Sequence, residues 1–220
     1  MQTLKCDAFL FDVDSTLVDS SDCIKSIWRI WSERYGFELE QVLKAVHGRT
    51  ISETLRMVAP DMAAEKFVVE VQNIALNEFK NVMAVKGAKK FLSKLPLESW
   101  AIATSGARHV SISSMRNAGL PIPGVVVAAE DVIRSKPDPE AYINAANLLG
   151  VKPENCIVFE DSMAGIKSGV ASGATVIALT TTHSANELTG LDFLIRDFSR
   201  LELRINQESS GQRFELVIHD

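Results

Sequence analysis

Two aspartates stand two residues apart, directly after an apolar run near the start of the chain. The segment DVDST at residues 12–16 follows residues 7–13 (DAFLFDV), a pattern typical of a buried strand. Neighbouring carboxylates such as Asp12 and Asp14 repel each other unless a cation or hydrogen bonds stabilise them. The pair is compatible with a Mg²⁺ site that carries a nucleophile, and taken alone also with a solvated acidic turn.

Three further segments combine residue types that could handle a phosphate. Thr104 and Ser105 end an apolar run, where hydroxyls and backbone N–H groups could cradle a phosphate or simply form a capped turn. Lys136 lies in KPDP, where it could neutralise an anion or remain a solvated lysine. Glu160 and Asp161 follow the apolar run CIVF, and they could share a divalent cation, or Asp161 could cap a helix.

The elements that must position these residues alternate along most of the chain. Apolar, β-branched runs predict strands at 100–104, 125–129, 156–160 and 175–179, separated by helical patterns at 88–95, 109–118, 140–149 and 164–170. This alternation indicates an α/β fold with a doubly wound, Rossmann-like parallel sheet. All four chemical segments then lie at or beyond the carboxyl ends of strands, the edge where such sheets bind ligands.

A helical insertion interrupts this pattern. Helical spacing is found at about 20–35, 39–46, 51–58 and 63–79, and no convincing strand is expected between residues 18 and 82. We therefore expect a small α-helical cap domain at 18–82, inserted after the first strand, and a catalytic core formed by 1–17 and 83–220. A further strand at 193–196 and a terminal hairpin of 201–206 and 214–219, with its turn at 208–211, complete the expected core.

Composition limits the partners. The chain has 220 residues, a net charge of −5 and a pI near 5.5, which argues against nucleic acid or an anionic membrane surface as a partner. The N-terminus resembles no signal peptide and the longest uncharged stretch is rich in polar residues, so we expect a cytoplasmic protein. The sequence favours a monomer but leaves a dimer open.

Four ordered motifs make the chain resemble the haloacid dehalogenase-like (HAD) superfamily of phosphatases. They are FDVDSTLVDS, AIATSG, SKPDPEAY and IVFEDSMAGIKSGVASGA. The resemblance covers nearly the whole chain and includes the helical cap. Within the superfamily the sequence is most similar to the sugar and polyol phosphatases of the β-phosphoglucomutase-like group, a branch that VHGRT at 46–50 also supports.

The resemblance implies a mechanism. Asp12 would attack phosphorus to form an aspartyl-phosphate, and Asp14 would act as general acid and then as general base. The cofactor Mg²⁺ would lie between Asp12, the Asp14 carbonyl and Asp161, with Glu160 assisting. The phosphoryl oxygens would be held by Thr104, Ser105 and Lys136.

Two regions should modify this scheme. Most members have glycine where this chain has Ser15, so the hairpin after the nucleophile should be strained. In the cap, we expect His47 and Arg49 to contact the sugar or polyol, the alternative being that both only face solvent. Trp28 and Trp31 are expected in the cap core rather than as a platform for sugar stacking.

The substrate implied is a small phosphorylated metabolite, hydrolysed as a sugar or polyol phosphate. Three alternatives remain: a sugar phosphomutase, a phosphoglycolate-type phosphatase and a non-enzymatic phospho-ligand binding protein. Ile24 argues against the mutase because it stands where related mutases carry a cap histidine, and Thr16 fits the phosphatase pattern. A dehalogenase would have no use for this set of acidic residues.

Overall fold

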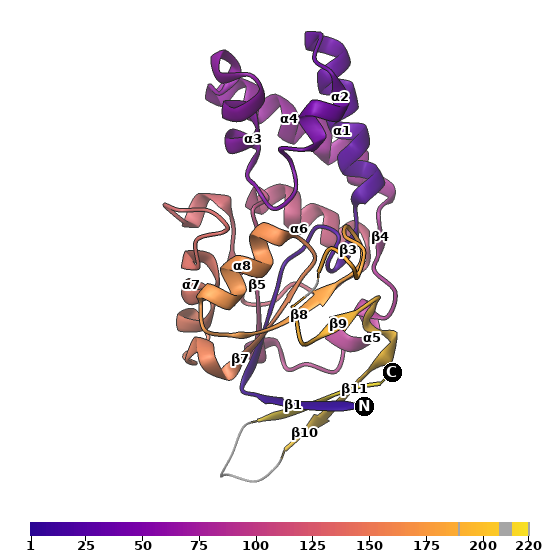
Figure 1. Ribbon diagram of the computed structural model, residues 1–220, viewed down its shortest axis with the longest axis vertical. Coiled ribbons are helices and arrows are strands. Elements are labelled where there is room, and N and C mark those ends of the chain that lie inside the picture. Colours follow the sequence, from indigo (N-terminus) through magenta and orange to yellow (C-terminus); the bar gives the residue numbers. More distant parts are fainter. Residues whose placement is uncertain (189, 207–212, 220) are drawn as a thin grey trace.

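A six-stranded parallel sheet forms the centre of the computed structural model, which describes residues 1–188, 190–206 and 213–219 (Figure 1). Its strands lie in the order β6-β5-β2-β7-β8-β9 and all neighbours are parallel. Their bounds are β2 (Ala8–Phe11), β5 (Trp100–Ala103), β6 (Val125–Val127), β7 (Cys156–Glu160), β8 (Thr175–Leu179) and β9 (Leu194–Ile195). The α/β, doubly wound architecture predicted from the sequence is confirmed.

Each face of the sheet has its own core because successive side chains of a strand alternate between faces. Phe9 and Phe11 of β2 belong to one buried cluster, while Ala8 and Leu10 belong to the other. The first cluster includes residues of α5 (Ala88–Leu92) and α6 (Arg108–Asn117), and the second includes residues of α7 (Glu140–Leu148) and α8 (Met163–Ala171). The central strands are therefore fixed from both sides, which makes their carboxyl ends a rigid platform.

Four helices lie at one end of the molecule, above those carboxyl ends (Figure 1). They are α1 (Ser21–Tyr35), α2 (Leu39–Leu43), α3 (Ile51–Val58) and α4 (Glu65–Glu78). The helical insertion is confirmed, while the domain boundaries drawn at 17/18 and 82/83 stay a prediction. The expectation of no strand in this stretch was wrong at its edge, since β3 (Val18–Asp19) pairs with β4 (Met83–Ala84). Two-residue strands carry no periodicity that a sequence pattern could reveal.

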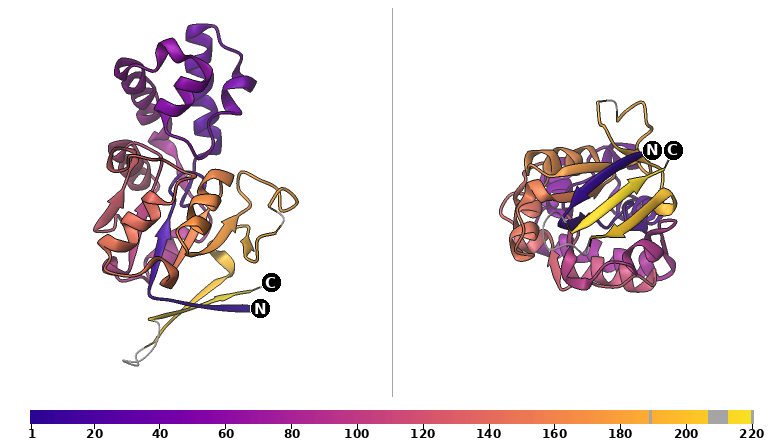
Figure 2. Two further views of the ribbon diagram at one scale, coloured as in Figure 1. Left: turned by 60° about the vertical axis from the view of Figure 1, so that its left-hand side comes forward. Right: turned by 90° about the horizontal axis from the view of Figure 1, so that it is seen from below.

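A separate three-stranded antiparallel sheet closes the opposite end, as Figure 2 shows from below. The predicted terminal pairing is confirmed by β10 (Leu201–Ile205) and β11 (Phe214–Ile218), whereas the predicted turn at 208–211 lies outside the described residues. The sequence analysis missed β1 (Gln2–Cys6), which pairs with β11 and is largely exposed. An exposed strand with little apolar alternation gives a weak signal.

Short 3₁₀ helices complete the described elements. They are η1 (Pro60–Met62), η2 (Phe79–Asn81), η3 (Leu97–Ser99), η4 (Ala129–Asp131), η5 (Pro153–Asn155) and η6 (Phe198–Arg200). Helix α7 starts at Glu140, as predicted, and Asp138 Oδ1 accepts from the Glu140 N–H at 3.0 Å. Among the described residues, no helix is both long and apolar enough to cross a membrane.

Candidate active site

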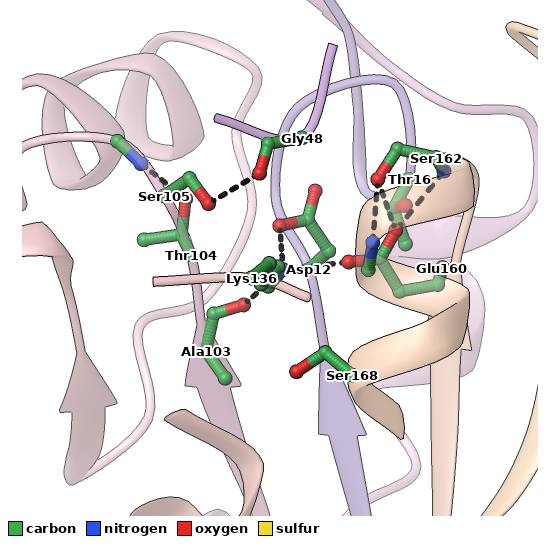
Figure 3. Close-up of polar contacts among 12 residues, drawn as sticks. Asp12, Thr16, Gly48, Ala103, Thr104, Ser105, Lys136, Glu160, Ser162 and Ser168 are labelled. Atoms are coloured by element: carbon green, nitrogen blue, oxygen red, sulfur yellow. Dashed lines mark hydrogen bonds and ion pairs between the residues drawn. The ribbon is translucent and has the colours of Figure 1, made fainter. Parts of the chain in front are cut away.

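The predicted chemical residues of the core meet at one edge of the sheet. Asp12 directly follows β2, Thr104 follows β5, and Glu160 ends β7, so the three lie at the carboxyl ends of adjacent strands. Lys136 reaches the same place from the loop before α7 (Figure 3). Strand order, which no local pattern reveals, is what joins these segments.

Lys136 is the central cation of the site. Its side chain is 2% exposed, and Nζ donates to Asp12 Oδ1 at 2.6 Å, to Glu160 Oε1 at 2.6 Å and to the Ala103 carbonyl at 3.0 Å. Burial lowers the pKa of this ammonium group, but the negative charges of Asp12 and Glu160 outweigh burial and hold the pKa above its ordinary value. Lys136 is therefore a permanent cation, and the alternative of a solvated lysine is wrong.

Glu160 has both carboxylate oxygens engaged. Oε1 accepts from Lys136, and Oε2 accepts from the Asp161 N–H at 3.0 Å, the Ser162 N–H at 3.0 Å and the Ser162 hydroxyl at 3.1 Å. A Cβ at Gly165 would lie 1.7 Å from Oε1, so only glycine lets this carboxylate fit under the first turn of α8. Glu160 is thus built to anchor Lys136, and its capacity to assist a metal is small.

The acidic residues at this edge of the sheet are not balanced by enough nearby positive charge. Ligand oxygens of Asp12, Glu160 and Asp161 lie within 4.8 Å of one another, and all three residues are buried. Burial, with the charges of Glu160 and Asp161, raises the pKa of Asp12 well above its ordinary range despite Lys136. Burial and the Glu160 charge raise the pKa of Asp161 to about 7. One lysine cannot balance three carboxylates, so a cation would be strongly stabilised here.

Asp161 points into this cluster rather than capping a helix. Its Oδ1 accepts from the Thr16 hydroxyl at 2.9 Å, which comes from the hairpin after β2. The residue that caps α8 is Ser162, whose hydroxyl accepts from the Gly165 N–H at 3.0 Å. The alternative interpretation of Asp161 as a helix cap is therefore wrong.

Asp14 has a different environment from Asp12. Its Oδ1 is buried and has no hydrogen-bond partner among the described residues. Burial raises the pKa of the carboxyl group, and the Ser20 hydroxyl and Lys136 only partly oppose it. A carboxyl group that holds its proton at higher pH than usual is suited to general acid chemistry.

The hairpin that follows Asp12 and Asp14 leads into the cap and contains Ser15, whose backbone is strained as expected. This serine has φ +59°, in the left-handed region that favours glycine. Its N–H donates to the Ser20 hydroxyl at 3.0 Å, its own hydroxyl lies 3.0 Å from that of Ser21, and its carbonyl accepts from Thr181 at 2.6 Å. Three contacts thus fix a backbone conformation that serine seldom adopts.

Thr104 and Ser105 both line the cavity that contains Asp12 and Asp14. The Thr104 hydroxyl accepts from the Gly106 N–H at 3.0 Å, whereas the Ser105 hydroxyl donates to the carbonyl of Gly48, a residue of the cap, at 2.9 Å (Figure 3). Neither residue caps α6, which begins after Ala107 without a side-chain cap. The Thr104 hydroxyl therefore caps the turn but not the helix, and Ser105 joins core to cap.

His47 and Arg49 line the same cavity on the cap side and are also exposed to solvent. The His47 ring lies 6.5 Å from that of His183, and burial together with that neighbour lowers the pKa of His47. Arg49 Nη1 donates to the Ala45 carbonyl at 3.3 Å. Both side chains thus border the cavity and also face solvent, so their contact with a sugar or polyol stays a prediction.

The sequence analysis missed Tyr142. This residue is fully buried in α7, its hydroxyl donates to Glu160 Oε1 at 2.9 Å, and Lys136 Nζ lies 4.9 Å from its ring centre. It therefore touches both partners of the central ion pair. The sequence signal that could have identified it is the tyrosine that ends the SKPDPEAY motif. This tyrosine lies in the first turn of the helix after Lys136, on the side that faces the sheet.

Comparison with known proteins agrees with this geometry. Residues 9–179 match the family described as haloacid dehalogenase-like hydrolase. Hexitol phosphatase A of Escherichia coli (strain K12) is 38% identical over 205 residues, covering 90% of this chain and 94% of that protein. Glycerol-1-phosphate phosphohydrolase 2 of Saccharomyces cerevisiae is 32% identical, covering 91% and 86%.

A solved structure described as a HAD hydrolase of family IA, variant 3, from Entamoeba histolytica has a TM-score of 0.76 and 26% identity, covering 89% of this chain and 95% of that one. The chain belongs to the haloacid dehalogenase-like hydrolase family.

Proposed function

We propose that the protein is a Mg²⁺-dependent phosphatase that hydrolyses small phosphorylated sugars or polyols. The observation that carries the proposal is the buried group of Asp12, Lys136, Glu160 and Asp161, which unites a nucleophile, a cation held by Glu160 and a further acidic ligand, Asp161. The relatives named hexitol phosphatase and glycerol-1-phosphate phosphohydrolase support the substrate class. The predicted cytoplasmic location and monomeric state stay predictions.

Asp12 is the proposed nucleophile. One of its carboxylate oxygens attacks phosphorus, the bond between phosphorus and the ester oxygen breaks, and an aspartyl-phosphate forms. Lys136 fixes the orientation of the Asp12 carboxylate through a 2.6 Å contact and offsets the negative charge that builds up on the phosphoryl group. Thr104 and Ser105 line the cavity, where the Thr104 hydroxyl and the Ser105 backbone N–H would hold phosphoryl oxygens, because the Ser105 hydroxyl already donates to Gly48.

Asp14 is the proposed general acid and base. Its raised pKa lets it give a proton to the departing ester oxygen and then accept one from the water that hydrolyses the aspartyl-phosphate. Inorganic phosphate and the free alcohol are the products, and the aspartate pair returns to its starting state.

The residues present suit a magnesium ion. Asp12 and Asp161, with the Asp14 backbone carbonyl, would hold it, because Mg²⁺ prefers one or two carboxylates with carbonyl, water and phosphate oxygens. The raised pKa of both carboxyl groups supports this assignment, because buried carboxylates are stabilised by a nearby cation. The ion would neutralise the phosphate ester so that an anionic carboxylate can approach it.

The helical insertion at 18–82 is the proposed specificity domain. Its loop brings His47 and Arg49 to the cavity that contains the two aspartates, where they would contact the hydroxyls of the leaving group. Ser105 couples this loop to the core through Gly48.

Release of inorganic phosphate from a panel of sugar and polyol phosphates, with phosphoglycolate and β-glucose 1-phosphate included, tests the proposal. We expect Mg²⁺-dependent turnover that falls at least about 10³-fold in Asp12→Asn, because the nucleophile is lost. Asp22→Asn, which removes an exposed carboxylate from α1, is the matched control and should keep wild-type activity.

The alternatives give different results in the same assay. Isomerisation of β-glucose 1-phosphate without stoichiometric phosphate would identify a mutase, and selective cleavage of phosphoglycolate would identify that phosphatase type. Binding of phosphate esters with no turnover would overturn the proposal in favour of a binding protein.

A further inference from the structure

The cavity above the aspartates has two ends of opposite chemistry. The core end is lined by acids and hydroxyls, among them Asp12, Asp14 and Thr104. The cavity continues between the cap helices, where it is lined by Ile24, Ile27, Trp28, Val71, Ala75 and Phe79. These six side chains, which we call the apolar wall, come from α1, α4 and η2.

The wall is closely packed and consists of aliphatic and aromatic side chains, among which the Trp28 indole N–H is the one hydrogen-bond donor. Five of its members are buried, from Val71 at 1% to Phe79 at 4% exposed, and Ile24 is half-buried. Trp28 was expected only in the cap core. It packs edge-on against Trp31, with ring centres 5.7 Å apart, and also borders the cavity. The wall is therefore a fixed surface that a bound leaving group would have to face.

Hydrogen-bonding groups are sparse on this side. The Thr54 hydroxyl lies within hydrogen-bond distance of the Thr50 and Ala45 carbonyls, at 3.1 and 3.3 Å, so its proton is committed within the cap. His47 and Arg49 remain as polar side chains at the cap end of the described lining. A leaving group with hydroxyls along its whole length would leave some of them without a hydrogen-bond partner against the wall, which weakens its binding.

We propose that the apolar wall selects phosphate monoesters whose leaving group ends in an aliphatic, deoxygenated portion over the same skeleton carrying a hydroxyl there. The inference rests on the proposed function, because the wall can select only if the site binds and cleaves a phosphate ester. His47 and Arg49 bind the hydroxyls near the ester, and the wall contacts the far end.

Matched substrate pairs test the proposal. Propane-1,2-diol 1-phosphate is compared with glycerol 1-phosphate, and a 6-deoxyhexitol 1-phosphate with the corresponding hexitol 1-phosphate, since each pair differs by one terminal hydroxyl. We expect kcat/KM to favour the deoxy member by roughly 10-fold in at least one pair, within the range that one hydroxyl in an apolar pocket produces.

Ile24→Asn places an amide in the wall at a half-buried position, where the fold tolerates a polar side chain best. It should bring the deoxy preference down several-fold. Ile30→Asn is the matched control: Ile30 is also half-buried on α1 but does not line the cavity, so the wild-type preference should remain. Thermal unfolding of each variant reports the fold, and Val71→Thr provides a second, nearly isosteric change in the wall.

The outcomes separate the two proposals. Absence of Mg²⁺-dependent phosphate release from both pairs and from the whole panel of sugar and polyol phosphates overturns the proposed function, whereas activity on the panel with none on either pair overturns the inference alone. Hydrolysis in which neither pair favours the deoxy member overturns the inference alone. A preference that stays unchanged in folded Ile24→Asn and Val71→Thr assigns the apolar wall to cap packing and also overturns the inference.

Discussion

Lys136 shows how much a single residue decides in this site. Its ammonium group joins Asp12 to Glu160, two acids that lie at the carboxyl ends of adjacent strands far apart in sequence. Because the lysine is buried and charged, the pair of carboxylates around it is stable only while each donor and acceptor keeps its partner. The residues that support Lys136, although they would never touch the substrate, should therefore control the rate.

Tyr142 offers a direct test at this scale. Tyr142→Phe removes the hydroxyl that donates to Glu160 but keeps the ring beside Lys136. We expect kcat to fall about tenfold with KM changed by less than about twofold, because a misplaced lysine stabilises the transition state less. Tyr35→Phe is the control, since it removes a tyrosine–glutamate hydrogen bond of the same kind, to Glu70, in the cap. Equal kcat values for the two variants would contradict the positioning role.

Ser15 gives a stability test. Ser15→Gly and Ser15→Ala both remove the hydroxyl that contacts Ser21, but only glycine adopts the φ of +59° without strain. The glycine variant should be more stable than the alanine variant by about 1 kcal/mol, which corresponds to about 2–4 °C in melting temperature for a chain of this size. Thermal unfolding measures the difference, and an alanine variant of equal or higher stability would argue against strain at this position.

At the scale of elements, the loop between α2 and α3 connects cap to core. The Gly48 carbonyl accepts from Ser105, and a Cβ at Gly48 would lie 2.7 Å from Ser162 Oγ and 2.9 Å from Ala164 Cβ. A residue with a side chain would therefore push the loop away from the first turn of α8. Close approach of these two segments is what brings His47 and Arg49 to the cavity.

Gly48→Ala tests this docking. Both Gly48 and Gly36 have φ +75°, but a Cβ at Gly36 meets nothing within 4 Å, so Gly36→Ala introduces the same backbone strain without the clash. We expect Gly48→Ala to lower kcat/KM for sugar or polyol phosphates by at least about tenfold, and Gly36→Ala to lower only the melting temperature. Similar kinetics for the two variants would show that cap docking does not depend on this contact.

At the scale of the whole molecule, the acidic edge of the sheet makes stability depend on pH and metal. The pKa of Asp161 is raised to about 7, above the value near 4 of an unfolded aspartate. Between these two values the native state binds more protons than the unfolded state, so the metal-free protein loses stability as the pH rises. A bound cation should remove that loss because it stabilises the deprotonated carboxylates.

The rise in melting temperature on adding Mg²⁺ measures this coupling. The increase should be larger at pH 8 than at pH 5.5, because protons compete with the ion at the lower pH. Asp161→Asn should abolish most of the increase at both pH values. An increase that is equal at the two pH values, or larger at pH 5.5, would contradict a site built on Asp161.

Much of the arrangement was predictable from local patterns. The alternation of apolar runs and helical spacing predicted the order of elements, and acids or hydroxyls at the ends of those runs predicted where Asp12, Thr104 and Glu160 lie. All strands of a parallel sheet run in the same direction, so the residues at their carboxyl ends lie at the same edge of the sheet. The strain at Ser15 was predicted from the family resemblance, because most members have glycine at this position and the Cβ of serine restricts φ.

The sequence by itself determined which chemical groups reach the edge of the sheet. Only the tertiary structure decided how those groups are paired: Glu160 binds Lys136, and Ser105 contacts the cap. It also decided that the cavity ends in the apolar wall. Hydrophobic periodicity and composition describe only a few neighbouring residues at a time. These contacts depend instead on which strands are adjacent and on how closely cap and core pack.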